Sequence, residues 1–136
     1  FSANKKAETM MARIMLAVAG LYFILGTALA LHMGLIADYR LGVVYAHIGG
    51  LGFLGLGLVG AIYLARPDMS SGIFAWAHFW LHMIGLPVLL IGLTMTQLDA
   101  FMTGHTIAII GMLLLLVGAV AFTINVVTRA RVDVRV

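Results

Sequence analysis

The chain has 136 residues, of which 63% are hydrophobic and only 10% are charged. A soluble domain usually carries about 25% charged residues, so this composition excludes an ordinary soluble domain, a separate catalytic module and a nucleic-acid-binding surface. The absence of cysteine excludes disulfides, thiolate metal sites and iron–sulfur clusters. The net charge of +3 is mainly a membrane topology signal rather than a sign of an anionic partner, because of where the basic residues lie.

Four apolar segments follow one another along the chain, at residues 14–35, 41–65, 72–96 and 106–127. Each has more than about 20 residues, which is the length that an α-helix needs to cross a hydrocarbon core. A segment in lipid must satisfy its backbone hydrogen bonds internally, which favours helices over strands. We therefore predict an all-α membrane protein in which residues 1–136 form a single four-transmembrane-helix bundle.

The basic residues predict the orientation of this bundle. Under four-span threading, one side holds Lys5, Lys6, Arg13, Arg66, Arg129, Arg131 and Arg135. Only Arg40 falls on the other side. Because short loops rich in Lys and Arg stay in the cytoplasm, we expect both termini there. A cleaved leader also begins with basic residues before an apolar run, but the length of the first run favours a retained helix.

Glycines recur every seven residues in the third and fourth segments. They are Gly85 and Gly92 in the third segment, and Gly104, Gly111 and Gly118 in the fourth. Small residues let helix backbones approach closely in lipid, so these rows predict helix packing. The second segment has more glycines than packing needs, and they would clear space for a flat ligand: Gly49, Gly50, Gly52, Gly55, Gly57 and Gly60.

Five histidines in a chain with so few charges are the main chemical signal. His47 lies about one and a half turns inside the second segment, and Gly50 follows three residues later on the same face. A histidine nitrogen can ligate haem iron, a neighbouring glycine would let the macrocycle lie against the backbone, and Arg40 is placed to pair with haem propionates. The alternative is a core histidine bonded to a backbone carbonyl, with Arg40 extended toward the lipid headgroups.

The other histidines are candidates for further ligands. His78 and His82 are four residues apart and share a helix face, so they form a candidate second metal or cofactor site. Hydrogen bonding between helices is the alternative for this pair. His32 and His105 lie near the outer ends of their segments and are the candidates for a second axial ligand of a haem at His47. Each of them taken singly is also compatible with an ordinary interfacial histidine.

Two motifs carry a resemblance to a known family. The second segment reads Tyr45-Ala46-His47-Ile48-Gly49-Gly50-Leu51-Gly52-Phe53, then Gly60-Ala61-Ile62-Tyr63 and Pro67. The third segment contains His78-Phe79-Trp80-Leu81 and Ile84-Gly85. These motifs resemble the tenth and eleventh helices of the catalytic subunit I of haem–copper oxidases, especially the cbb-type cytochrome c oxidases. The whole chain resembles the last four helices of that subunit, as a small member of a subunit I-like family.

The resemblance implies roles for individual residues. His47 falls on the histidine that is the axial ligand of the low-spin haem b. The family's other histidine in this motif ligates the oxygen-reducing haem, and Tyr45 replaces it here. The copper ligands of the family lie on helices that have no counterpart in this sequence. The resemblance therefore implies a subunit without independent catalysis, in a bacterial cytoplasmic membrane.

We therefore expect a membrane cytochrome b-like protein that binds haem b through His47, with Arg40 and Gly50 nearby and His105 or His32 as the second axial ligand. Its expected role is one-electron transfer in or beside a respiratory or other redox membrane complex. The lipid bilayer is the expected surrounding, and the glycine rows favour a homo-oligomer or docking into a larger complex. Two alternatives stay open. One is a haem carrier, assembly factor or gas sensor, and the other is a cofactor-free structural accessory subunit.

Overall fold

The computed structural model describes residues 2–129, and within that range the side chains of residues 6–7 and 9–129. The side chain of Lys5 and the residues Arg131 and Arg135, which contribute to the predicted orientation, lie outside this description. The elements in chain order are α1 (Ser2–Ile36), α2 (Gly42–His47), the π-helix η1 (Ile48–Gly55), α3 (Leu56–Ala65), the 3₁₀-helix η2 (Pro67–Ser70), α4 (Ile73–Gln97) and α5 (Phe101–Arg129).

Four helices in the described part of the chain are long and apolar enough to cross a membrane: Thr9–Ile36, Gly42–Ala65, Ile73–Gln97 and Phe101–Arg129. This confirms the predicted all-α, four-span fold class. The first and last helices begin earlier than the predicted spans, at Ser2 and Phe101. The physical reason is that a helix satisfies its own backbone hydrogen bonds, so it continues past the apolar segment into the polar flanks.

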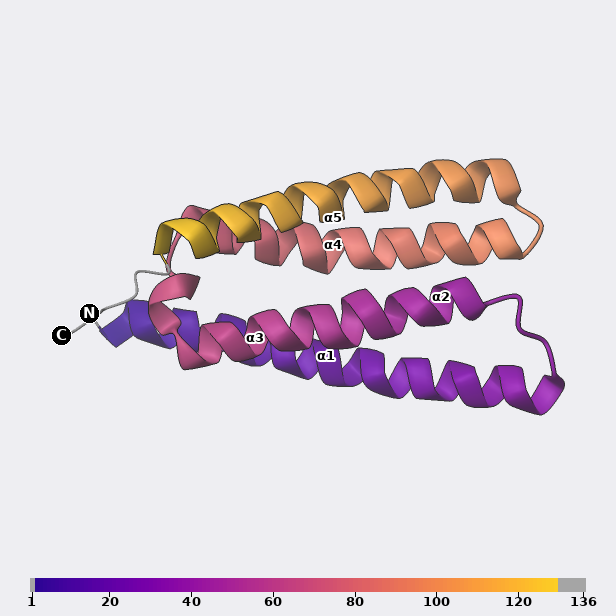
Figure 1. Ribbon diagram of the computed structural model, residues 1–136, viewed down its shortest axis with the longest axis horizontal. Helices are drawn as coiled ribbons and strands as arrows, with labels where there is room; N and C mark the ends of the chain where they lie inside the picture. The colour runs from indigo at the N-terminus through magenta and orange to yellow at the C-terminus, as the bar shows by residue number, and fades with distance from the viewer. Residues whose placement is uncertain (1, 130–136) are drawn as a thin grey trace.

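The helices form two antiparallel hairpins (Figure 1). In the first hairpin, α1 runs beside the composite helix made of α2, η1 and α3, and in the second, α4 runs beside α5. Figure 1 shows the two hairpins close together at the end that holds η2 and farther apart at the end where α2 begins.

The α4–α5 hairpin is held by direct contact between backbones. A Cβ atom at Gly92 would collide with the backbone of Ala108, and one at Gly111 would collide with the backbone of Leu89. At both positions the two helix backbones are therefore too close to leave room for a side chain. This confirms that the seven-residue glycine rows pack helices together.

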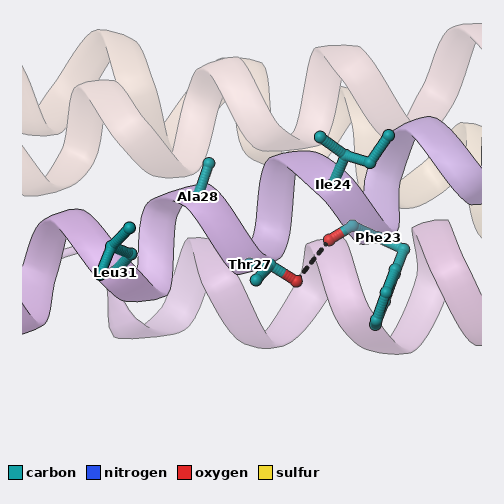
Figure 2. A pocket seen from close by; sticks show the side chains of 5 residues that line it. All are labelled: Phe23, Ile24, Thr27, Ala28 and Leu31. Carbon is teal, nitrogen blue, oxygen red and sulfur yellow. Dashed lines mark hydrogen bonds between the residues drawn. The ribbon is translucent and has the colours of Figure 1, made fainter.

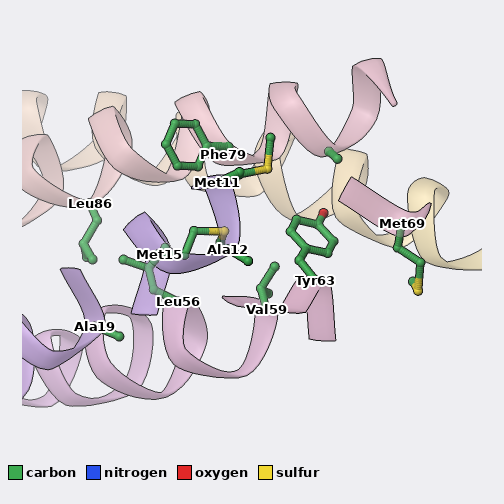
Figure 3. Packing of buried hydrophobic residues seen from close by; sticks show 11 residues of the cluster. Met11, Ala12, Met15, Ala19, Leu56, Val59, Tyr63, Met69, Phe79 and Leu86 are labelled. Atoms are coloured by element: carbon green, nitrogen blue, oxygen red, sulfur yellow. The ribbon is translucent and has the colours of Figure 1, made fainter. Parts of the chain in front are cut away.

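Larger side chains fill the space between the two hairpins. The buried cluster shown in Figure 3 consists of Met11, Ala12, Met15, Ala19, Leu56, Val59, Tyr63, Met69, Ala75, Phe79 and Leu86. In Figure 3, Met11 lies beside Phe79 and Met15 lies beside Leu56. Methionine is unbranched and adapts its shape to irregular gaps. The apolar contact between the hairpins is therefore made by side chains, of which the methionines are adaptable.

In each of the two loops at the α2 end, one residue adopts a left-handed backbone conformation just after the preceding helix. Ala37 has φ 52° after α1, and Asp99 has φ 70° after α4. The amide of Asp38 donates to the Met33 carbonyl over 3.2 Å, and the amide of Ala100 donates to the Met95 carbonyl over 3.0 Å. These bonds satisfy carbonyls at the helix ends that have no partner within the helix.

Candidate functional site

His47 is the last residue of α2, and its ring is bonded to its own helix. Its Nδ1 lies 2.7 Å from the carbonyl oxygen of Val43. Because a carbonyl only accepts, Nδ1 donates the proton and Nε2 keeps its lone pair. No hydrogen bond to Nε2 occurs among the described residues, and the side chain is half-buried. The backbone bond fits a structural histidine, and it is equally the bond that orients a ligating histidine.

The glycines after His47 are of two kinds. Gly49 and Gly50 border open space, since no described atom beyond the local helix backbone lies within 4 Å of a Cβ placed at either position. Gly52 is different, because a Cβ there would collide with the ring of Tyr22 in α1. The open surface that the sequence predicted along this segment is therefore present at the two glycines nearest His47, whereas Gly52 serves packing.

The segment that follows His47 is wound as a π-helix, Ile48–Gly55, which the sequence did not predict. Its Leu51 carbonyl oxygen lies 3.0 Å from Nε2 of His82 in α4. A Cβ at Gly55 would lie 3.6 Å from Cε1 of the same ring. The side of the π-helix that carries Leu51 and Gly55 therefore faces α4. His47 directly precedes this segment.

His78 and His82 are buried inside the bundle, with exposed fractions of 4% and 8%. Their rings are 5.3 Å apart in an edge-to-face arrangement, and His78 also lies 5.2 Å from the ring of Phe122. The bond from His82 to Leu51 is the interhelical hydrogen bond weighed as an alternative for this pair. Nδ1 of His78 is buried and has no hydrogen-bond partner within the described structure. Residues 2–129 contain no group of three or more His, Cys, Asp or Glu side chains that could hold a metal ion.

Arg40 and His32 share a pocket of about 230 Å³ at the α2 end of the molecule. The pocket is lined by His32, Met33, Ile36, Asp38, Arg40, Leu41 and Leu98. His47 does not line this pocket. The structure therefore groups Arg40 with His32 and Asp38, at the ends of α1 and α4, rather than in one pocket with His47.

The Arg40 guanidinium is already engaged by Asp38. Its Nε and Nη2 donate to Oδ2 of Asp38 over 2.9 and 2.7 Å, and the amide of Arg40 donates to Oδ1 over 3.0 Å. Hydrogen bonds from the Arg40 side chain, followed by the bond from its amide, hold the pKa of Asp38 below its usual value. The pair is open to solvent, which limits its contribution to stability. A haem propionate at Arg40 would have to share the guanidinium with this carboxylate.

The two candidates for a second axial ligand have different surroundings. His105 lies on the exposed side of α5 and stacks on Phe101, with ring centroids 5.7 Å apart and planes at 6°. His32 is exposed near the end of α1, in the pocket with Asp38. His32 therefore shares its pocket with a carboxylate, whereas the ring contact of His105 is apolar.

A second hollow lies on the surface of α1 (Figure 2). Its volume is about 340 Å³, and its lining residues are Phe23, Ile24, Thr27, Ala28 and Leu31. The Thr27 hydroxyl donates to the Phe23 carbonyl over 2.8 Å, as the dashed line in Figure 2 marks. The Thr27 hydroxyl is the only polar side-chain group among these lining residues. Its apolar side chains suit lipid acyl chains.

The sequence also did not predict that the Asn125 side chain is buried at the η2 end of the bundle. Nδ2 of Asn125 in α5 lies 2.7 Å from the Met69 carbonyl and 3.4 Å from the Tyr63 hydroxyl. Its Oδ1 is buried without a hydrogen-bond partner among the described residues. The signal available in the sequence was a lone asparagine in the apolar fourth segment. The amide connects α5 to η2, which follows the first hairpin.

Comparison of the chain with protein-family models, with curated proteins and with solved structures gives no match. The resemblance to subunit I of the haem–copper oxidases therefore rests on the motifs around His47 and His78, and it stays a prediction.

Proposed function

We propose that the protein is a membrane cytochrome b-like subunit that binds haem b through Nε2 of His47 and takes part in one-electron transfer in or beside a membrane redox complex. The hydrogen bond between Nδ1 of His47 and the Val43 carbonyl carries this proposal. It fixes the proton on Nδ1, so the lone pair of Nε2 is available to a metal. Nε2 has no hydrogen-bond partner among the described residues, so it is free to ligate.

The surroundings of His47 support a flat ligand. Gly49 and Gly50 leave the backbone uncovered on the helix turn next to the histidine. The Val43 carbonyl accepts from the imidazole and makes it a stronger ligand. The apolar helices supply a low dielectric, which together with the axial ligands sets the reduction potential. Haem b, when bound, supplies reversible exchange of one electron at its iron.

The second axial position is proposed for His105 or His32. His105 carries no carboxylate neighbour in its stacking contact with Phe101, while the ring of His32 lies in the pocket with Asp38. Separate substitution of the two histidines distinguishes these candidates.

A visible spectrum of the detergent-purified full chain tests the proposal. The reduced-minus-oxidised spectrum of wild type is expected to show a sharp b-type α-band, and a pyridine haemochrome assay is expected to give stoichiometric haem b. His47→Ala should abolish both signals. His105→Ala and His32→Ala, made separately, identify the second ligand. Wild type that is folded and supplied with haem but binds none would disprove the proposal, as would full haem occupancy in His47→Ala.

The same preparation distinguishes the alternative functions. A five-coordinate reduced spectrum with carbon monoxide binding would favour a haem carrier or gas sensor over an electron carrier. A chain that stays folded and assembles normally without haem, and is unaffected by His47→Ala, would favour a structural accessory subunit.

A further inference from the structure

The geometry points to His82 as a positioning residue for His47, acting from the opposite hairpin through the π-helix between them. This inference rests on the proposed function, because it gives His82 a role in aiming the haem ligand. It starts from one contact, the 3.0 Å hydrogen bond between Nε2 of His82 and the carbonyl oxygen of Leu51.

The winding of η1 decides the direction of His47. A π-helix contains more residues per turn than an α-helix, and such segments are frequent at functional sites. If residues 48–55 rewound as an α-helix, α2 would turn relative to α3 by about 100°, the angle of one helical residue. His47 lies directly before this segment. Rewinding would therefore change the direction in which its ring points relative to α3.

His82 supplies the interaction that favours the π-helical winding. The amide of Leu56 donates to the Leu51 carbonyl, five residues earlier, as π-helical winding requires. The same carbonyl oxygen also receives the Nε2 proton of His82. The His82 ring lies beside Gly55, since a Cβ at Gly55 would be in ordinary van der Waals contact with Cε1 at 3.6 Å. Because His82 is only 8% exposed, water is poorly placed to replace this bond.

His78 provides a matched comparison within the same helix. It is buried to the same degree and lies one turn before His82. Its Nδ1 has no hydrogen-bond partner in the described part of the chain, and no hydrogen bond joins its ring to η1 there. Replacing His78 therefore changes a buried imidazole in α4 without removing a link to the π-helix.

The experiment uses the full chain in detergent with His82→Phe, His82→Gln and His78→Phe. The first measurement is hydrogen–deuterium exchange of the amides of residues 48–56, which needs no haem. His82→Phe is expected to speed this exchange about three- to tenfold, the effect of losing one net hydrogen bond. His82→Gln retains an N–H donor of similar reach and should restore slow exchange. His78→Phe should leave the exchange of these amides as in wild type.

The second measurement is the midpoint potential and low-spin electron paramagnetic resonance spectrum of haem-loaded protein. His82→Phe should shift both, and His82→Gln should return both toward wild type. Equal exchange in wild type and His82→Phe would overturn the inference, and so would an unchanged potential and spectrum in the haem-loaded variant. Faster exchange in His82→Phe of a protein that binds no haem would instead overturn the proposed function, leaving His82 as a residue that holds the π-helix.

Discussion

The two hairpins hold together by different means. In the second, α4 and α5 touch backbone to backbone at Gly92 and Gly111. In the first, Gly52 receives the side chain of Tyr22. A Cβ at Gly60 would come no nearer than 3.3 Å to the backbone oxygen of Ala12. A π-helix also interrupts the regular winding. A clash between two backbones cannot be relieved by a change of side-chain rotamer, whereas a clash with a side chain can be. We therefore call α4–α5 the rigid hairpin. The first hairpin, which carries the candidate site at His47, is called the adjustable hairpin.

The largest expected effect would break the rigid hairpin. Gly111→Ala places a Cβ against the backbone of Leu89, and we expect it to lower the free energy of unfolding by about 3 kcal/mol. Unfolding in detergent by added denaturant, followed by circular dichroism, measures this loss.

Gly50→Ala is the matched control in the adjustable hairpin. No described atom beyond the local helix backbone lies within 4 Å of a Cβ there, and alanine is the better helix former. We expect a change of less than about 1 kcal/mol. An equal loss for Gly111→Ala and Gly50→Ala would contradict the assignment of Gly111 to a close backbone contact and of Gly50 to open space.

A smaller effect is expected at the contact between η2, which follows the first hairpin, and α5 of the second hairpin. Asn125→Leu removes the 2.7 Å hydrogen bond to the Met69 carbonyl and leaves that carbonyl unpaired. It also removes the unpartnered Oδ1, which offsets part of the loss. The net cost should be about 1–2 kcal/mol in the same unfolding measurement. Thr123→Val is the control, because the Thr123 hydroxyl bonds only within its own helix, to Ala119. A stabilised Asn125→Leu would mean that the unpartnered Oδ1 costs more than the bond contributes.

The smallest expected effect concerns the first loop of the adjustable hairpin. The pKa of Asp38 is lowered by its bonds from Arg40, so the folded state binds this proton less tightly than the unfolded state. The stabilisation is therefore present above the usual carboxyl pKa and is lost as pH falls through the lowered value. Between pH 6 and pH 3, the melting temperature of wild type should fall slightly more than that of Asp38→Asn. Parallel curves for the two proteins would show that the exposed pair contributes nothing measurable.

The sequence predicted the features that depend on local pattern. Segment length and hydropathy were enough for the four helices, and glycine spacing was enough for the α4–α5 contact at Gly92 and Gly111. The bond from His47 to Val43 is also local, since four residues separate them. It matches the carbonyl-bonded histidine that the sequence left as an alternative, without deciding between that role and ligation.

The rest depends on contacts between distant residues. The π-helix is stabilised by His82, which lies 31 residues from Leu51, and no spacing rule connects those two positions. The bond from Asn125 to Met69 spans 56 residues and was equally invisible. The engagement of Arg40 by Asp38 is local, but the sequence did not indicate whether Arg40 would turn to Asp38, to a propionate or to the headgroups.

The ion pair in the first loop has a consequence for insertion into the membrane. Asp38 and Arg40 cancel each other's charge, so the loop between α1 and α2 carries no net charge. A membrane potential does work of roughly 2.3 kcal/mol per elementary charge per 100 mV. That field does little work on this loop and acts instead on charges such as Lys6 and Arg129 at the opposite end. The charge asymmetry on which the predicted orientation depends is therefore found at that opposite end.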